Sequence, residues 1–288
     1  MVSDINKHAY LIMAHSNFSQ LRTLIALLDD RRNDIYLHVD KKATSFNIDS
    51  IKTLYSNLFI VDRINVNWGG YSQIRCELNL LKAAISKQYQ YYHLLSGLDL
   101  PLRKQDYIHE YFAQNSSRNY IGFSKSTEGT ASFISRILYY HLFQDVIGRK
   151  KGLFITVLGK MEHILLCLQK TLKIERKQAY LPYKGCNWFS ITHALASYIV
   201  EHEAEIKKQY CFTERADEIF IHSIVMASPL RDSIVDESLR AIDWERGNPY
   251  TYRIEDIDAL LNMPKLFARK FDERIDQAAI NKVVKYLE

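Results

Sequence analysis

Short apolar runs alternate with amphipathic segments over the first hundred residues of the chain. Runs of strand length, rich in aliphatic, β-branched and aromatic residues, occupy 8–16, 34–40, 58–63 and 91–97. Between them, apolar positions recur every three or four residues at 18–30, 48–57 and 71–88, as in helices with one buried face. Strands that alternate with helices predict βαβ units, so we expect an α/β fold with a mainly parallel sheet and flanking helices.

Residues 130–178 have a different pattern, which is apolar, aromatic and basic with few acids. We expect a helical insertion here, formed by one long helix or by two. Amphipathic helices commonly pack on a core, whereas basic ones also lie on anionic membranes, and the pattern leaves both readings open.

The last third of the chain resumes the strand and helix alternation. Strand-like runs at 185–192 and 239–244 and helical patterns at 193–210 and 215–228 follow one another without a linker or a repeat. We therefore expect one domain over 1–288, interrupted by the insertion at approximately 130–178.

Composition and net charge indicate which classes of protein the chain can belong to. Apolar residues make up 47% of the chain and charged residues 25%, an ordinary globular balance. The net charge of +5 is mild and no nucleic-acid-binding motif is visible, so we expect no nucleic-acid partner.

Cysteine usage and the N-terminal residues bear on location. Cys76, Cys167, Cys186 and Cys211 lie far apart and form no CxxC pair, which favours reduced thiols and a cytoplasmic protein. The N-terminal residues lack the basic start and cleavage site of a signal peptide. No apolar run reaches the roughly 18 residues of a membrane span.

Polar and glycine residues follow the four predicted strands of the first hundred residues. Ligands of open α/β sheets bind at the carboxyl ends of the strands, so these residues are candidates for a site, although turns use the same residue types. Trp68 is the least expected of them, because a turn with two glycines does not need an aromatic residue. The candidates are His15, Asp40, Trp68, Gly69 and Asp99.

Acidic residues open two of the predicted helices. Asp217 and Glu218 fit either the favourable charge of a first helical turn or, for Glu218, a general base. Asp256 and Asp258 have the Asp-x-Asp spacing of metal-binding transferases, but residues two apart on a helix point in different directions. We therefore expect no metal at this pair.

Six segments in this order resemble glycosyltransferase family 14: "HVDKK", "NWGGYS", "LLSGLDLPL", "GCNWFSIT", "ADEIFIHSIV" and "LFARKFD". This family holds the core-2/I-branching β-1,6-N-acetylglucosaminyltransferases and the peptide O-xylosyltransferases. The chain lacks the membrane anchor and paired cysteines of the animal members, so it looks like a bacterial relative that acts in surface-polysaccharide synthesis.

The resemblance implies a GT-A fold and an inverting transfer from a UDP-sugar to a glycan hydroxyl without a metal cofactor. The expected donor is UDP-GlcNAc, with UDP-xylose, UDP-glucose and UDP-galactose left open. Glu218 matches the family's catalytic base, and Lys270, beside Arg269 in "LFARKFD", matches the lysine that binds the diphosphate. Arg246 is the nearest candidate for the family's second cation. His15 and Asp40 fall where the family contacts the nucleotide.

The resemblance also places Gly69 and Asp99 near the sugar or the acceptor, with Trp68 and Trp188 as sugar platforms or core residues. The acceptor is expected to be a glycan or a lipid-linked glycan, with the protein in the cytoplasm or peripheral on the inner membrane face. Two other functions stay open: a metal-dependent transferase that uses Asp256 and Asp258, and a non-catalytic glycan-binding domain.

Overall fold

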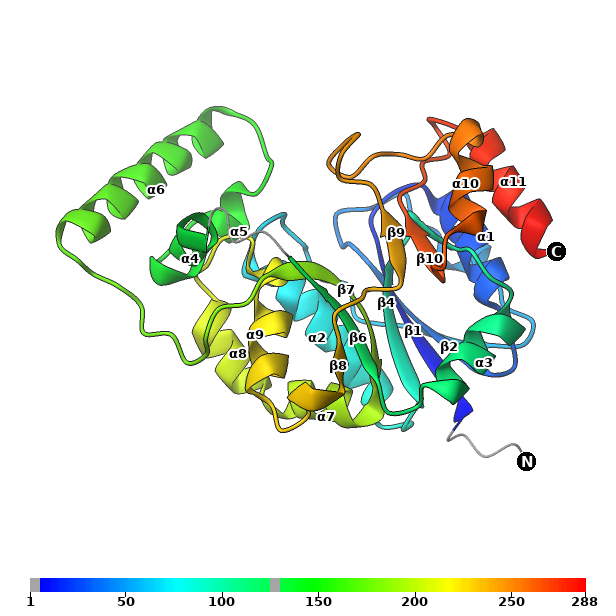
Figure 1. Ribbon diagram of the computed structural model, residues 1–288. Helices are drawn as coiled ribbons and strands as arrows, with labels where there is room; N and C mark the ends of the chain where they lie inside the picture. Colours follow the sequence, from blue (N-terminus) through cyan, green and yellow to red (C-terminus); the bar gives the residue numbers. More distant parts are fainter. Residues whose placement is uncertain (1–5, 125–129) are drawn as a thin grey trace.

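A seven-stranded, mostly parallel sheet forms the centre of the molecule, which confirms the predicted α/β class. The computed structural model describes residues 6–124 and 130–288, with the side chains of 130–132 left out. The strand order is β3-β2-β1-β4-β7-β6-β8, and within the described sheet only β7 runs opposite to its neighbours (Figure 1). The strands are β1 (His8–Ala14), β2 (Asn33–Val39), β3 (Asn57–Ile60), β4 (Tyr91–Ser96), β6 (Asn119–Phe123), β7 (Gly185–Thr192) and β8 (Ile234–Val235).

Helices cover both faces of the sheet, and successive residues of β1 point into two separate cores. Tyr10 and Ile12 face the core formed with α1 (Phe18–Leu28), α3 (Gln105–Gln114), α10 (Ile257–Asn262) and α11 (Gln277–Leu287). Ala9 and Leu11 face the core formed with α2 (Tyr71–Ile85), α7 (His193–Glu201), α8 (Glu203–Tyr210) and α9 (Phe220–Ala227). Burial on both faces explains why β1 is a continuous apolar run rather than an alternating one.

A second, three-stranded sheet extends the carboxyl end of β4. It consists of β5 (Asp99–Pro101), β10 (Phe267–Arg269) and β9 (Arg240–Ile242), in the order β5-β10-β9. The register pairs Arg269 with Asp99. This sheet therefore brings the C-terminal segment "LFARKFD" to the end of β4, a contact between residues about 170 positions apart in the chain.

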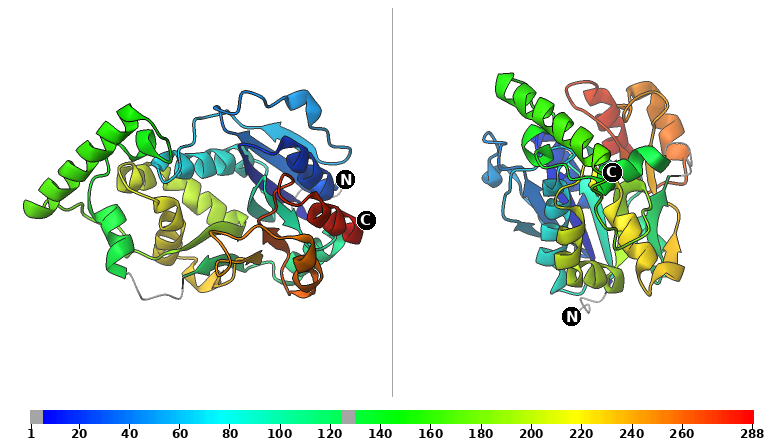
Figure 2. Two further views of the ribbon diagram at one scale, coloured as in Figure 1. Left: turned by 90° about the horizontal axis from the view of Figure 1, so that it is seen from above. Right: turned by 90° about the vertical axis from the view of Figure 1, so that its left-hand side faces the viewer.

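The predicted insertion is helical, but it contains three helices rather than one or two. They are α4 (Thr130–Leu138), α5 (Gln144–Ile147) and α6 (Leu153–Thr171). Figures 1 and 2 show α6 standing out from the body of the protein at the end remote from α11. No helix among the described residues is long and apolar enough to cross a membrane.

The predicted helix at 48–57 is wrong, since only the 3₁₀ turn η2 (Ile48–Ser50) forms there. The backbone N–H groups of Leu54 and Ser56 donate instead to the carboxylate of Asp29, at 2.5 and 2.7 Å. A distant acceptor has replaced the helical hydrogen bonds. The remaining 3₁₀ turns are η3 (Ala216–Glu218), η4 (Arg231–Ser233) and η5 (Ile254–Asp256).

Two other predicted elements are divided. The helix predicted at 193–210 is interrupted at His202, which separates α7 from α8. The helix predicted at 215–228 begins only at Phe220, because Asp217 and Glu218 lie in the preceding turn η3. The strand predicted at 239–244 exists as β9, but it belongs to the small sheet.

Candidate active site

The carboxyl ends of β1, β2 and β4 lie level at one edge of the sheet, because Ala14 pairs with Val39 and Met13 with Ser96. The antiparallel strand β7 begins at the same edge with Gly185, since its last residue, Thr192, pairs with Tyr91 at the start of β4. Of the predicted site residues, His15, Asp40 and Asp99 follow these strand ends within three residues, at the edge where α/β sheets bind ligands.

His15 and Asp40 are neighbours directly after β1 and β2. Desolvation lowers the pKa of His15, the charge of Asp40 opposes this shift, and that of Arg269 adds to it. The Asp40 carboxylate accepts the N–H of Lys42 at 2.9 Å and lies 3.3 Å from the Lys42 ammonium. This corner therefore joins the ends of β1 and β2 to the end of β10.

Asp99 is fully buried and holds Arg269 in place. One Asp99 oxygen accepts the N–H of Ser96 at 2.8 Å, and the other accepts the Arg269 guanidinium at 2.8 Å. The guanidinium carbon also lies 4.4 Å from the centre of the Trp188 ring. Asp99 and Trp188 thus orient a cation at the strand ends. The sequence places Arg269 beside Lys270 but does not identify it as the partner of Asp99, although an acid within the apolar run "GLDLPL" already requires a buried partner.

Lys270 follows Arg269 and is half-buried. Among the described residues, its ammonium makes no hydrogen bond or ion pair with another side chain. Arg246 differs, because it is exposed and already contacts two carboxylates, Asp243 at 2.6 Å and Asp256 at 2.7 Å. The charge of Lys270 is therefore the more available of the two for an anionic ligand.

Asp256 and Asp258 do not converge. Asp256 accepts the N–H of Arg253 at 2.8 Å and pairs with Arg246, whereas Asp258 pairs with Lys282 at 2.7 Å. Their different partners agree with the expectation that they point apart on the helix. In the part of the chain that the structure describes, no cluster of three His, Cys, Asp or Glu residues has the geometry of a metal site.

Glu218 lies in η3 with its carboxylate between two cations. One oxygen is 3.1 Å from Arg136 of α4 and 3.6 Å from Lys184, directly before β7. The side chain is 38% exposed, so a ligand can reach it. The two cations fix the orientation of a carboxylate that stays open to solvent.

Asp217 points the other way, into the protein. Its carboxylate accepts the Gln73 amide at 3.0 Å. Burial, and then the charge of Glu218, raise the pKa of Asp217 to about 7. Glu77 is fully buried nearby, and burial followed by the charge of Asp217 raises its pKa well above the ordinary value. Glu218 is thus the exposed carboxylate of a cluster whose buried members favour the neutral form.

The turn at Trp68, Gly69 and Gly70 connects α2 with the insertion. Gly69 has φ +73°, and a Cβ on Gly70 would lie 2.0 Å from the Asp145 carboxylate, so α5 can dock only against glycine. Gln73 accepts the Gly69 N–H and donates to Asp217. One Gln73 amide therefore links this turn to the turn that holds Glu218.

Trp68 is 40% exposed, and Arg149 of the insertion lies 4.0 Å from its ring centre. The amide of Gln144 donates to the Trp68 carbonyl at 3.3 Å. A cation thus covers one face of the ring, and only the rest of the indole is available to a sugar.

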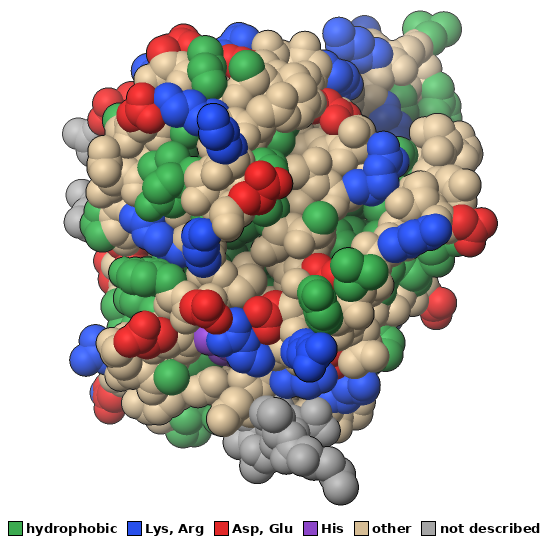
Figure 3. All heavy atoms as spheres, turned by 90° about the vertical axis from the view of Figure 1, so that its right-hand side faces the viewer, with side chains coloured by type: hydrophobic (Ala, Val, Ile, Leu, Met, Phe, Trp, Pro, Cys, Tyr) green, Lys and Arg blue, Asp and Glu red, His purple; other side chains and the backbone are tan. Residues whose placement is uncertain are grey.

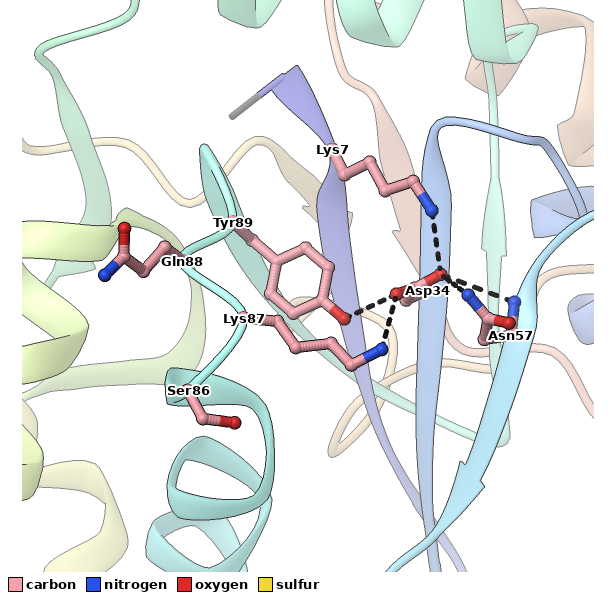
Figure 4. A pocket seen from close by; sticks show the side chains of 7 residues that line it. All are labelled: Lys7, Asp34, Asn57, Ser86, Lys87, Gln88 and Tyr89. Atoms are coloured by element: carbon pink, nitrogen blue, oxygen red, sulfur yellow. Dashed lines mark hydrogen bonds and ion pairs between the residues drawn. The ribbon is translucent and has the colours of Figure 1, made fainter. Parts of the chain in front are cut away.

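A pocket of about 430 Å³ lies at the opposite edge of the sheet, where the strands begin (Figure 4). Its central carboxylate, Asp34, already contacts Tyr89 at 2.6 Å, Asn57 at 2.9 Å and Lys7 at 3.5 Å. These partners satisfy both oxygens and tie β2 to the chain before β1 and β4. We assign this pocket a structural role, because its acid is satisfied and no predicted site residue lines it.

The chain is similar to known proteins over most of its length. The family model for the Core-2/I-branching enzyme matches residues 8–261, which include Glu218. A xylosyltransferase of Ciona intestinalis is 24% identical over 94% of this chain and 33% of its own length. Xylosyltransferase 2 of Rattus norvegicus is 23% identical over 94% of this chain and 32% of its own length. The chain spans about a third of the length of these curated relatives.

Among solved structures, the apo form of mouse xyloside xylosyltransferase 1 aligns with a TM-score of 0.37 and 9% identity, covering 83% of this chain and 89% of that one. A TM-score of this size carries no argument about fold or function.

Proposed function

Since the chain belongs to the Core-2/I-branching enzyme family, we propose that it is an inverting glycosyltransferase that moves a sugar from a UDP-sugar to a glycan hydroxyl. Glu218 carries the proposal. It is an accessible carboxylate, oriented by Arg136 and Lys184, at the edge of the sheet where the strands end. A carboxylate held beside a nucleophilic hydroxyl is what a general base requires.

In the proposed step, Glu218 takes the proton of the acceptor hydroxyl as its oxygen forms a bond to the anomeric carbon. The bond from that carbon to the UDP oxygen breaks, and its electron pair leaves with UDP from the opposite face. One displacement inverts the anomeric centre, so an α-linked donor gives a β-linked product.

The leaving diphosphate gains negative charge, which fixed cations stabilise. We assign this role first to Lys270, whose ammonium has no side-chain partner among the described residues, and then to Arg246, which must share its charge with Asp243 and Asp256. Arg269 offers a third cation beside the same segment. His15 and Asp40 are proposed to contact the nucleotide.

Metal independence belongs to the same proposal. Asp99 and Arg269 support it, because the Arg269 guanidinium is the cation that lies beside the Asp99 carboxylate. Asp256 and Asp258 support it too, because each is engaged by a different cation.

We propose that Trp68 and Gly69 border the acceptor, while Asp99 and Trp188 act through Arg269. UDP-GlcNAc remains the first proposed donor, and the names of the relatives make UDP-xylose the second. The acceptor is proposed to be a glycan or a lipid-linked glycan. The expectation of a bacterial, cytoplasmic protein in surface-polysaccharide synthesis stays a prediction, since the relatives reported above are animal proteins.

Replacing Glu218 with Gln tests the base directly. The amide keeps the shape of the side chain but is a much weaker proton acceptor, so we expect transfer to fall by on the order of 10²–10⁴. Sugar release and transfer are followed as UDP production with a panel of UDP-sugars and glycan acceptors, in EDTA. Binding of UDP, measured alongside, should change little.

The matched control is Glu110→Gln, an exposed glutamate on α3. It should retain the full rate. If Glu218→Gln transfers sugar as fast as the unchanged protein, Glu218 is not the base. If the unchanged protein binds glycans but transfers nothing from any donor, either in EDTA or with Mg²⁺ or Mn²⁺ added, a non-catalytic glycan-binding domain replaces this proposal.

A further inference from the structure

Helix α6 carries large apolar residues on the side that it turns to solvent. Its buried residues are polar: Glu162 accepts the Phe143 N–H at 3.2 Å, and Gln169 exchanges two hydrogen bonds with the backbone of Tyr140. Several of its exposed residues are large and apolar, with Leu153 at 84%, Phe154 at 68% and Ile164 at 65% exposed. The half-buried positions 155, 158, 165 and 166 are apolar as well, so the helix turns apolar side chains both to its own protein and to solvent.

The exposed apolar residues form one stripe. Positions 154, 157, 161, 164 and 168 recur at intervals of three and four, so they lie on one side of the helix. We call this stripe, with Leu153, the outward face of α6. Its members are Leu153, Phe154, Val157, Met161, Ile164 and Leu168, all exposed. A continuous exposed apolar stripe of this kind marks a binding surface.

The charge around the stripe indicates what it binds. Segment 149–177 holds eight Lys or Arg residues and two Glu, which gives it a net charge of +6. The whole chain has a net charge of +5, so the remaining residues together have a net charge of −1. Of these cations only Arg176 is buried. On the face of the molecule shown in Figure 3, which is remote from α6, positive and negative side chains are interspersed.

We infer that α6 binds the surface of an anionic lipid bilayer, with its outward face in the interface and the surrounding lysines on the lipid headgroups. An apolar stripe flanked by cations is the pattern of interfacial helices, and anionic headgroups attract each nearby Lys or Arg. A second copy of the chain fits less well, because pairing two α6 helices would bring two segments of net charge +6 together.

The insertion would also connect the lipid contact of α6 to the proposed catalytic centre. Arg136 of α4 pairs with Glu218, and α5 docks on Gly70 through Asp145. Docking would therefore hold the site close to the membrane, where a lipid-linked acceptor is presented. This consequence rests on the proposed function, whereas the lipid contact itself does not.

Vesicle sedimentation of the full chain tests the inference without any activity measurement. The probes are phosphatidylcholine vesicles and vesicles with about a third phosphatidylglycerol. We expect binding to the anionic vesicles only, and several-fold weaker binding at about 0.5 M NaCl, where screening is strong. The triple variant Phe154→Ser, Ile164→Ser, Leu168→Ser should bind at least about tenfold more weakly, because three apolar side chains no longer enter the interface.

A second variant removes charge: Lys160→Gln, Lys170→Gln, Lys173→Gln should also lose most of the binding. Two controls alter matched, exposed residues elsewhere and should bind as the unchanged protein does. The control for the apolar variant is the triple change Leu54→Ser, Met263→Ser, Ile275→Ser. The control for the charge variant is the triple change Lys52→Gln, Lys207→Gln, Lys285→Gln. Circular dichroism and UDP binding show whether each variant is folded.

The inference is overturned if the unchanged protein does not bind anionic vesicles at low salt, or if both α6 variants bind as well as their controls. Sedimentation velocity supplies a further contradictory result. In that result, the unchanged protein is a dimer, the triple variant at Phe154, Ile164 and Leu168 is a monomer, and anionic vesicles do not dissociate the dimer. The outward face of α6 would then bind a second copy of the chain instead.

Discussion

Asp217 and Glu218 are adjacent in the chain but face different environments. Glu218 is open to solvent between Arg136 and Lys184, whereas Asp217 is buried against Gln73. Burial disfavours the charged form of a carboxyl group. The structure therefore gives one acid the access that a base requires and raises the pKa of the other to about 7, so that Asp217 keeps its proton in mildly acidic solution.

Stability should reflect this buried acid. The pKa of Asp217 is raised from 3.8 to about 7 in the folded protein, so the folded state retains a proton that the unfolded chain releases. The contribution of Asp217 to the free energy of unfolding is full below pH 4 and is lost as the pH rises to about 7, by up to about 4 kcal/mol. Asp217→Asn cannot lose a proton, so its urea-unfolding free energy should lack this decline.

The measured quantity is the difference in the free energy of unfolding between the unchanged protein and Asp217→Asn at each pH from 4 to 8. Taking this difference removes the contributions of the other titrating groups. Glu205→Gln, an exposed acid on α8, is the control and should give a flat difference. A flat difference for Asp217→Asn as well would mean that Asp217 ionises as freely in the folded protein as in the unfolded chain.

At the scale of elements, a buried ion pair joins β5 to β10 in the small sheet. Asp99 is fully buried between Ser96 and Arg269. Removing only one partner of a buried pair leaves the other charge uncompensated, which typically costs about 3–5 kcal/mol. Arg269→Met should therefore lower the free energy of urea unfolding by an amount of this order.

Two controls separate this effect from the loss of a surface charge. Arg274→Met removes an exposed arginine that pairs with Asp272 and should cost far less, because water screens an exposed pair. The double change Asp99→Leu with Arg269→Met should recover much of the lost stability, since neither charge remains. Equal costs for Arg269→Met and Arg274→Met would contradict the role given to Asp99.

The elements that the sequence predicts well are those with local causes. Strands β1, β2 and β4 and helices α1 and α2 follow from apolar period and length, because each has enough buried residues to show its pattern. The segment 48–57 fails for the opposite reason. Its backbone donates to Asp29, some 25 residues earlier, and no local pattern can reveal that partner.

The site was predictable in part. The edge of the sheet follows from the βαβ pattern, and the structure places His15, Asp40 and Asp99 there. Arg136 and Gln73 were missed, and so was the pairing of Arg269 with Asp99. The partners of these three residues, Glu218, Asp217 and Asp99, are all distant in sequence. Each partnership arises from the packing of an insertion or a second sheet, which periodicity does not describe.

At the scale of the whole molecule, three distant parts of the chain meet at one edge of the main sheet. The first strands bring His15 and Asp40, the insertion brings Arg136 to Glu218, and the small sheet brings Arg269 and Lys270. Positive groups thus surround this edge from two sides. Such an arrangement suits a donor with a diphosphate, whose charge the protein can balance with its own side chains.

The most direct test is a calorimetric titration of the protein with UDP and UDP-GlcNAc, in EDTA throughout. We predict micromolar binding without a divalent metal and binding at least about tenfold weaker in Lys270→Ala, since a charged contact to phosphate is lost. Lys285→Ala, an exposed lysine on α11, should bind as the unchanged protein does. No binding until Mg²⁺ or Mn²⁺ is added would contradict the account and return Asp256 and Asp258 to consideration.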